Sequence, residues 1–261
     1  MDILEELSAA RRADAHEREK ATPYREVLRR IAAAPAAKDF AAAFRGKGLH
    51  VISELKKASP SEGLIRADFR PEELAVELAQ AGAAALSVLC EPHRFLGDEA
   101  YLRAARARVT VPILYKDFIT TNYQVAEARL AGADAVLLIA AVLNDADLLS
   151  LKAHAHALGM KALVETHTAD EIRRAVDLGC EVIGVNCRNL RDFSTDVSLL
   201  EELVGRIPAR LTRIAESGMH SAEAIRRAHD AGADGFLVGT ALMRAPRPGE
   251  KLRELMMNDE R

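Results

Sequence analysis

The stretch NYQVAEARLAGADAVLLI occupies residues 122–139. Apolar residues recur at helical spacing in its first part, Gly132 follows, and the β-rich run Ala135–Ile139 ends it. Glycine is common directly after a helix because it adopts the left-handed conformation there at little cost. The stretch therefore predicts a helix, the glycine that ends it and the strand that comes next.

The same order of helix, glycine and strand recurs along the chain. Ala-Gly-Ala stands at residues 81–83, 131–133 and 231–233, and Leu-Gly-Cys at 178–180 takes the equivalent place. These glycines are 50, 47 and 53 residues apart, which corresponds to about two strand–helix units each. The repeat indicates one architecture built from such units.

From His50 onward, eight β-rich runs alternate with amphipathic runs. Eight βα units without a Pro-, Gly- or Ser-rich linker predict the α/β class and a (β/α)8 TIM barrel. A doubly wound sheet is less favoured, because no G-x-G-x-x-G follows the first strand. The predicted strands are Val51–Glu54, Ala85–Cys90, Val111–Lys116, Ala135–Ile139, Lys161–Glu165, Val182–Asn186, Arg213–Glu216 and Gly235–Val238. The predicted helices include Pro71–Ala81, Asn122–Ala131, Asp145–Leu158, Ala169–Leu178 and Ser221–Ala231.

Residues 1–46 precede the first predicted strand and have apolar residues at roughly helical spacing. The sequence therefore predicts one barrel domain over residues 1–261, with an N-terminal helical extension that Pro23 and Pro35 divide. Basic residues of the extension are interleaved with acidic ones and are predicted to lie on a solvated helix face. These basic residues are Arg11, Arg12, Arg18, Lys20, Arg25, Arg29 and Arg30.

Composition limits the classes of function. The 261 residues are 49% hydrophobic and 29% charged, and the formal net charge of −3 argues against non-specific nucleic-acid binding. Three cysteines without a C-x-x-C pair favour a reducing, cytoplasmic location. The N-terminus lacks the pattern of a secretory signal, and the longest apolar run, Ala135–Leu143, is too short to cross a bilayer. No membrane partner is predicted.

Polar groups follow most of the predicted strands. Strands of a parallel barrel are buried on both faces, and barrel enzymes build their sites at the carboxyl ends of the strands. Charged or amide groups at many of these ends therefore predict a shared polar mouth. The groups are Glu54-Leu55-Lys56-Lys57, Cys90-Glu91, Lys116-Asp117-Phe118, Glu165, Asn186-Cys187-Arg188, Glu216-Ser217-Gly218 and Val238-Gly239-Thr240.

Strand alternation predicts which of these side chains enter the barrel. Residues two apart share a face, so Ile52, Glu54 and Lys56 point together, and the helix-covered outer face tolerates charge badly. The same count groups Lys116 with Leu114 and Phe118, Glu165 with Leu163, and Asn186 with Gly184. The alternatives are a purely structural ion pair for Glu54 and Lys56, a surface position for Lys116, and an orienting role for Glu165.

The last two strands indicate phosphate binding, and metal binding is not predicted. Ser217-Gly218 and Gly239-Thr240 follow strands seven and eight, where barrels often hold phosphate with backbone N–H groups. None of the eight histidines belongs to a ligand-like cluster, and Cys187 has no adjacent base in the sequence.

Six motifs together resemble the indole-3-glycerol phosphate synthase family. They are ELKKASPSEGLIR at 54–66, ILYKDFI at 113–119, LVE at 163–165, IGVNCRNL at 183–190, AESG at 215–218 and FLVGTALMR at 236–244. The resemblance covers nearly the whole chain, although Thr240 and Cys187 depart from the family's usual residues. The rivals are another phosphate-binding barrel, such as phosphoribosylanthranilate isomerase, and a non-catalytic sugar-phosphate-binding barrel. Lys116 and the pair of Glu54 with Lys56 argue against the isomerase.

The resemblance implies an activity and a set of roles. The family converts 1-(2-carboxyphenylamino)-1-deoxyribulose 5-phosphate into indole-3-glycerol phosphate in tryptophan biosynthesis, releasing CO2 and water, and implies no cofactor or metal. By resemblance Lys116 is the acid of ring closure, and a nearby Lys56 is expected to lower its pKa. Glu165, Lys56 and Glu54 are the candidates for the acid and base of the dehydration. The extension is expected to cover part of the barrel mouth.

Substrate-binding residues follow from the same resemblance. Asn186, which is counted with the catalytic residues, and Glu216 are expected to hold the sugar hydroxyls and order the polar network. Arg188 is expected to hold the substrate carboxylate, with phosphate binding or a structural role as the alternatives. Phosphate is expected on the backbone of Gly218, Gly239 and Thr240. The remaining predicted contacts are Ser217 near the phosphate, Ser59 and Pro60, and an apolar wall of Phe95, Phe118, Leu137 and Leu190. The predicted partner is the sugar phosphate alone, and the protein is expected to be a monomer or weak homodimer.

Overall fold

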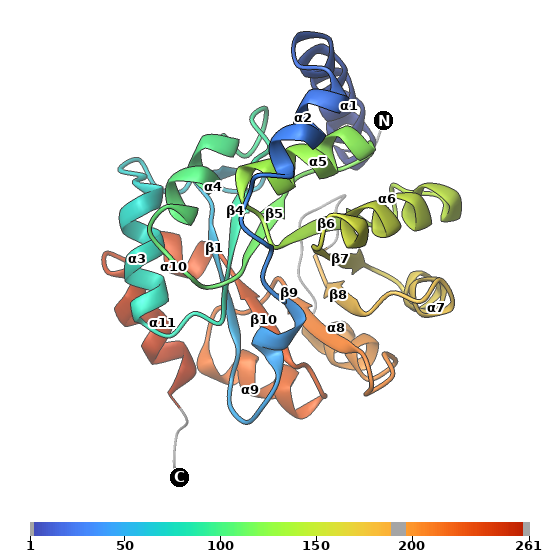
Figure 1. Ribbon diagram of the computed structural model, residues 1–261. Helices are drawn as coiled ribbons and strands as arrows, with labels where there is room; N and C mark the ends of the chain where they lie inside the picture. The colour runs from blue at the N-terminus through green and yellow to red at the C-terminus, as the bar shows by residue number, and fades with distance from the viewer. Residues whose placement is uncertain (1–2, 189–196, 258–261) are drawn as a thin grey trace.

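The computed structural model describes residues 3–188 and 197–257, and in these ranges eight parallel strands close into a barrel (Figure 1). Neighbouring strands follow the order β1-β10-β9-β8-β7-β6-β5-β4 around it. The strands are β1 (Val51–Leu55), β4 (Ala85–Leu89), β5 (Ile113–Lys116), β6 (Ala135–Ile139), β7 (Lys161–Thr166), β8 (Val182–Asn186), β9 (Thr212–Glu216) and β10 (Gly235–Val238). The predicted (β/α)8 barrel is thus confirmed.

Helices surround the strands on the outside (Figure 1). They are α3 (Pro71–Gln80), α4 (Glu99–Arg106), α5 (Asn122–Ala131), α6 (Asp145–Ala157), α7 (Ala169–Asp177), α8 (Val197–Val204), α9 (Ala222–Asp230), α10 (Thr240–Arg244) and α11 (Pro248–Met256). Five of them begin where a side-chain oxygen accepts a backbone N–H of the first turn, at Asp98, Thr121, Asn144, Thr168 and Ser221. The helix before β6 ends as predicted, with Gly132 at φ 99°.

Two layers of apolar side chains hold the barrel together. The inner layer includes Ile52, Leu114 and Leu163, which are fully buried at the centre of the barrel. The outer layer includes Val51 and Val164, which pack toward the helices. Successive residues of a strand alternate between the layers, so the predicted inward direction of Glu54, Lys116 and Glu165 follows from their inner-layer neighbours.

The N-terminal extension divides into three parts. Helices α1 (Ile3–Ala21) and α2 (Tyr24–Ile31) lie on either side of Pro23, and a 3-10 turn at Ala41–Phe44 comes directly before the barrel. Phe40 and Phe44 join the inner apolar layer, and Phe44 packs against Gly235 at the start of β10. The helical extension is therefore confirmed only in part, because residues 32–40 are not helical.

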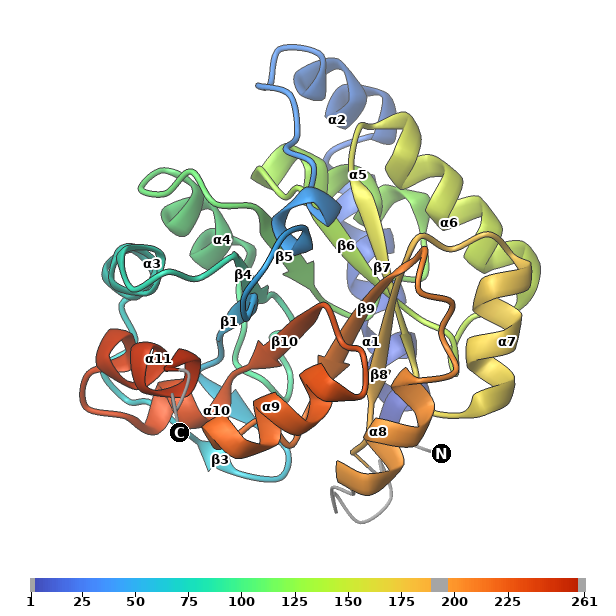
Figure 2. The same ribbon diagram turned by 90° about the horizontal axis from the view of Figure 1, so that it is seen from below.

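The parts of the extension lie at opposite ends of the barrel. Figure 2 shows α1 behind the strands and the segment that leads from α2 to β1 in front of them. The carboxyl end of the barrel is thus covered by α1, and the amino end is closed by Phe40 and Phe44. A short hairpin of β2 (Ala58–Ser59) and β3 (Gly63–Leu64) follows β1 at the carboxyl end.

Candidate active site

A pocket opens at the carboxyl end of the barrel, and every predicted site residue that the structure describes lines it. Leu190 lies outside the described residues. The lining residues that were predicted are Glu54, Lys56, Ser59, Pro60, Phe95, Lys116, Phe118, Leu137, Glu165, Asn186, Arg188, Glu216, Ser217, Gly218, Gly239 and Thr240. The shared polar mouth therefore exists, built from the ends of strands that are far apart in the sequence.

Lys116 lies between two carboxylates at the centre of this pocket. Its Nζ is 2.7 Å from Glu216 Oε2 and 3.2 Å from Glu165 Oε2. The ion pairs are buried, since the lysine side chain is 13% exposed and that of Glu216 is 1% exposed. Interactions between charges are strong in such a water-poor setting. The predicted surface alternative for Lys116 is wrong.

The carboxylates keep Lys116 protonated. Burial disfavours the ammonium, but Glu216, Glu165 and Glu54 outweigh burial and raise the pKa of Lys116 above the ordinary lysine value. The direction is opposite to the lowering that was expected from Lys56. Lys56 is itself paired with Glu54 at 2.9 Å, and its charge is largely compensated there.

Glu165 and Glu216 differ in their affinity for a proton. Burial raises the pKa of Glu216 to about 7, and the partial compensation by Lys116 is opposed by the nearby charge of Glu165. Burial acts on Glu165 in the same direction, but Lys116 and His167 outweigh it and lower the pKa of that carboxyl. Glu216 is therefore the group of this pair that can hold an exchangeable proton near neutral pH.

Glycines make room for two of the carboxylates. A Cβ at Gly184 in β8 would overlap Glu216 Oε1, and a Cβ at Gly239 would overlap Glu54 Oε2. Any side chain at either position would therefore displace a carboxylate. Gly239, after β10, thus leaves room for the Glu54–Lys56 pair and also belongs to the expected phosphate site.

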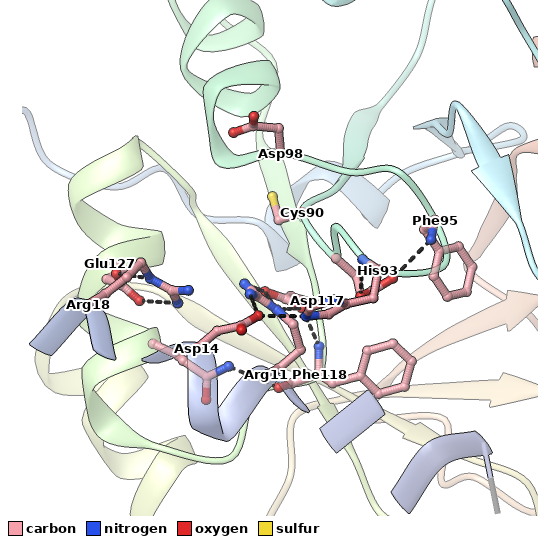
Figure 3. A network of polar contacts seen from close by, with 12 residues as sticks. Arg11, Asp14, Arg18, Cys90, His93, Phe95, Asp98, Asp117, Phe118 and Glu127 are labelled. Atoms are coloured by element: carbon pink, nitrogen blue, oxygen red, sulfur yellow. Dashed lines mark hydrogen bonds and ion pairs between the residues drawn. The ribbon is translucent and has the colours of Figure 1, made fainter. Parts of the chain in front are cut away.

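The aromatic side of the pocket is held by a polar network. The rings of Phe95 and Phe118 tilt toward one another with centroids 6.3 Å apart. Glu91, fully buried after β4, accepts the backbone N–H groups of His93, Arg94 and Phe95 at 2.6–2.9 Å. Figure 3 shows Phe95 and Phe118 beside this network. The Glu91 carboxylate therefore holds the backbone that carries Phe95.

Helix α1 covers this side of the pocket. Ile3, Leu4 and Leu7 line it, as the resemblance led us to expect of the extension. Arg11 reaches from α1 to Asp117, with Nη2 2.6 Å from Oδ2 and Nε 2.9 Å from Oδ1 (Figure 3). The Arg11 side chain is 5% exposed, so its predicted place on a solvated face is wrong.

Further contacts tie α1 to the barrel. Asp14 accepts from Arg11 at 2.7 Å and lies 2.8 Å from His93 Nε2. Arg18 pairs with Glu127 of α5 at 2.6 Å. Interleaved acidic and basic residues predict a helix that is exposed to solvent. The barrel residues that pair with α1 lie far from it in the sequence. Local charge patterning could not have revealed them.

The residues after β8, β9 and β10 form the remaining wall. Ser217 and Gly218 adopt left-handed backbone angles, with φ of 64° and 73°. Asn186 Oδ1 accepts the Ser217 hydroxyl at 2.7 Å and the Arg188 backbone N–H at 3.1 Å. Arg188 also donates to Ser61 of the hairpin after β1 at 2.9 Å. Arg188 thus links the two rims of the pocket.

Two histidines near the site were not predicted. His220 lines the pocket three residues after Ser217, and burial with the neighbouring Arg188 and Lys56 lowers its pKa. His167 lies directly after β7, with Nε2 3.4 Å from Glu165 Oε1. The signal that could have found His167 is its spacing of two from Glu165, which places both on one side of the chain as β7 ends.

Within residues 3–188 and 197–257, no group of three or more His, Cys, Asp or Glu side chains could hold a metal ion. No helix in these ranges is long and apolar enough to span a membrane.

Comparison with solved structures gives the fold. Thiamine phosphate pyrophosphorylase from Pyrococcus furiosus aligns with a TM-score of 0.60 at 17% identity, covering 83% of this chain and 96% of that one. Orotidine 5'-phosphate decarboxylase from Pyrococcus horikoshii aligns with a TM-score of 0.60 at 14% identity, covering 79% of this chain and 97% of that one. At these identities the likeness extends to the barrel alone.

Sequence comparison gives the family. The family described as indole-3-glycerol phosphate synthase matches residues 4–255. An indole-3-glycerol phosphate synthase of Streptomyces griseus is 43% identical, covering 98% of this chain and 95% of that protein. One of Azoarcus sp. is 44% identical, covering 97% of this chain and 98% of that protein. With the matching barrel and polar mouth, these relations show that the chain belongs to the indole-3-glycerol phosphate synthase family.

Proposed function

We propose that the pocket converts 1-(2-carboxyphenylamino)-1-deoxyribulose 5-phosphate into indole-3-glycerol phosphate, with Lys116 as the general acid of ring closure. The observation that carries the proposal is the buried ammonium of Lys116, held by two carboxylates in a pocket that Phe95 and Phe118 also line. A positioned proton donor at that place serves a reaction that builds negative charge on a ketone oxygen.

Ring closure forms a carbon–carbon bond between the ring carbon that bears the carboxylate and the ketone carbon. The ketone oxygen takes the proton of Lys116 as it becomes a hydroxyl. The carboxylate then leaves as CO2, and the electron pair of the broken bond returns to the ring. The carboxylates beside Lys116 weaken it as an acid, so substrate binding must loosen its contact with Glu165 or Glu216.

Dehydration removes a proton from the new ring and the former ketone oxygen as water. Glu54, Lys56 and Glu165 are the candidates for this base and acid, and all three face the pocket. Lys56 is 2.9 Å from Glu54, so a proton can pass within this pair without entering bulk water.

Recognition of the substrate is divided among the walls. The phosphate is assigned to the backbone of Gly218, Gly239 and Thr240, near the left-handed turn at Ser217. The aromatic ring is assigned to Phe95, Phe118, Leu137 and Leu190, with Ser59 and Pro60 at the rim. Asn186 and Glu216 are assigned to the sugar hydroxyls, and Arg188 to the substrate carboxylate.

Product formation can be followed by indole fluorescence, because the protein contains no Trp. We expect indole emission to grow with the amount of enzyme, and Lys116→Ala to reduce kcat by about 100-fold or more while ligand affinity is kept. Lys47→Ala, at an exposed lysine before β1, is the matched control and should behave as the wild type.

Three outcomes decide the proposal. Activity that persists in Lys116→Ala would keep the reaction and move the acid to another group, first to Lys56. Absence of indole from folded wild-type protein would contradict the proposed reaction. Loss of affinity together with turnover in Lys116→Ala would make Lys116 a binding residue.

The domain organisation, the cellular location and the oligomeric state of the chain are also proposals. We propose one domain over residues 1–261, supported by inner-layer packing of Phe40 and Phe44 from the extension. A reducing, cytoplasmic location is supported by three buried thiols, at Cys90, Cys180 and Cys187. A monomer or weak homodimer is proposed because the exposed large apolar side chains of the described residues are few and scattered.

A further inference from the structure

His167 lies between two carboxylates at the edge of the site. Its Nε2 is 3.4 Å from Glu165 Oε1, and its Nδ1 is 3.6 Å from Glu171 Oε2. The side chain is 14% exposed, and no described residue offers either ring nitrogen a hydrogen bond of ordinary geometry. Two carboxylates therefore flank the buried imidazole, and both favour its protonated form.

Glu171 is fixed on the outer side of His167 by the start of α7. Its Oε2 accepts the backbone N–H of His167 at 2.7 Å, and its own backbone N–H donates to the Thr168 hydroxyl at 3.2 Å. These bonds satisfy N–H groups that a helix start leaves without partners. The start of α7 therefore holds the carboxylate of Glu171 beside His167.

Glu165 connects His167 to Lys116. One of its oxygens faces His167 and the other lies 3.2 Å from Lys116 Nζ, which in turn contacts Glu216. The groups that act on His167 thus belong to α7, β7, β5 and β9. Together with His167 they form a row in the order Glu171, His167, Glu165, Lys116 and Glu216. Negative and positive groups alternate along this row.

We propose that His167 is a positioning residue that, as an imidazolium, keeps Glu165 ionised and leaves Glu216 as the carboxyl that carries the exchangeable proton. The effect of His167 on catalysis rests on the proposed function of this pocket. Burial disfavours the imidazolium, but Glu171 and Glu165 outweigh burial and raise the pKa of His167. Burial also acts against the Glu171 anion, and His167 outweighs it and lowers the pKa of that carboxyl.

The alternation has a consequence for the reaction. Without a charge at His167, Glu165 and Glu216 would share the single ammonium of Lys116 in a buried site. Two neighbouring carboxylates then compete for a proton, and Glu165 would be protonated at a higher pH. A protonated Glu165 attracts Lys116 less strongly and cannot act as a base.

The dependence of kcat on pH tests the charge of His167. His167→Gln removes the imidazolium, and we expect the acid limb of the profile to move up by about one pH unit. On that limb the variant should be about tenfold less active than the wild type, while the loss above it is small. His156→Gln, at an exposed histidine of α6, is the matched control and should leave the limb in place.

Glu171→Gln tests the same proposal from outside the pocket. Its amide oxygen can still accept the His167 N–H, so the start of α7 is kept, but the anion beside the imidazole is lost. We expect the acid limb to move in the same direction as in His167→Gln, by a smaller amount. An equal fractional loss at every pH in both variants would contradict the proposal, because a purely structural defect has no such pH dependence.

Titration of histidine ring signals by NMR reads the charge directly and needs no turnover. We expect the midpoint of His167 to lie above the ordinary value of 6.5 in the wild type and to fall in Glu171→Gln. A midpoint at or below 6.5 in the wild type would overturn the proposal. A wild-type protein that makes no indole would instead contradict the proposed function, and the titration would still decide the charge of His167.

Discussion

At the scale of single residues, the pocket places two glutamates on one lysine and treats them differently. Glu165 has a second cation in His167, whereas Glu216 Oε1 is buried beside Gly184 with no hydrogen-bond partner among the described side chains. An unpaired buried oxygen is costly when charged and acceptable when it holds a proton. The two carboxyls can therefore divide the tasks of ion pairing and proton storage.

The raised pKa of Glu216 predicts a pH-dependent stability. The folded chain binds the proton up to pH about 7, whereas an unfolded glutamate releases it near the ordinary value of 4.5. The contribution of this group to stability is therefore complete below 4.5 and is lost as the pH rises through 7. Glu216→Gln is neutral at every pH, so we expect its Tm, relative to the wild type, to increase between pH 5 and pH 8.

Thermal unfolding at the two pH values measures this difference. Glu223→Gln, at an exposed glutamate of α9, is the matched control, and its Tm should keep a constant offset from the wild type. A constant offset in Glu216→Gln as well would mean that Glu216 is ionised in the folded chain across this range.

At the scale of elements, the extension has two separate tasks. Helix α1 lies over the pocket with Leu4 and Leu7, whereas Phe40 and Phe44 fill the amino end of the barrel. Deleting residues 1–45 would remove α1 together with Phe40 and Phe44. The deletion would therefore change KM and lower stability at the same time, and the two effects could not be separated. A substitution in the anchor of α1 is therefore the sharper test of the covering role.

Arg11→Leu removes that anchor and leaves Asp117 buried without its cation. We expect the free energy of unfolding to fall by about 3 kcal/mol, as for other broken buried pairs. We also expect KM to rise by about tenfold, because α1 no longer holds its apolar side chains over the pocket. Steady-state kinetics and denaturant unfolding measure the two effects.

Arg12→Leu is the control on the same helix. Arg12 is exposed and makes a 3.3 Å contact with the Thr120 hydroxyl, so both effects should be small. A fall in stability with an unchanged KM in Arg11→Leu would show that α1 is a structural brace and has no part in substrate binding.

At the scale of the whole molecule, the two ends of the barrel separate function from stability. The repeated Ala-Gly-Ala-Asp motif places Asp134 and Asp234 at the amino end, just before β6 and β10. Asp134 accepts the backbone N–H groups of Lys38 and Ile113 at 2.7 and 2.8 Å, and it pairs with Arg106 at 2.9 Å. It thereby ties the extension, β5 and α4 together.

Asp134→Ala should therefore reduce stability and spare function. We expect the free energy of unfolding to fall by about 3 kcal/mol, because Arg106, the buried N–H of Ile113 and the partly buried N–H of Lys38 lose their acceptor. KM should stay unchanged, since the pocket lies at the other end of the strands. Asp170→Ala, at an exposed aspartate of α7, is the control, and a raised KM in Asp134→Ala would show that the two ends are coupled.

Much of this architecture could be predicted from the sequence. The bounds of β6, β8 and β10 agree with those predicted, because a buried parallel strand and a glycine-ended helix each have a local signature. The alternation of side chains along each strand also predicted that Glu54, Lys56, Lys116 and Glu165 face the barrel interior, and all four line the pocket. Helix α4 and the β2–β3 hairpin were not singled out, since one is short and the other consists of two-residue strands.

The sequence by itself determined the barrel, the inward direction of its polar strand ends and the family, because periodicity and motif spacing are properties of the chain read in order. Only the tertiary structure decided that Arg11 is buried against Asp117, 106 residues away, and that His167 faces Glu165. It also set the surroundings that raise the pKa of Glu216 and lower that of Glu165. Burial and the distances between charges set a pKa, and both arise only when strands remote in sequence close into one barrel.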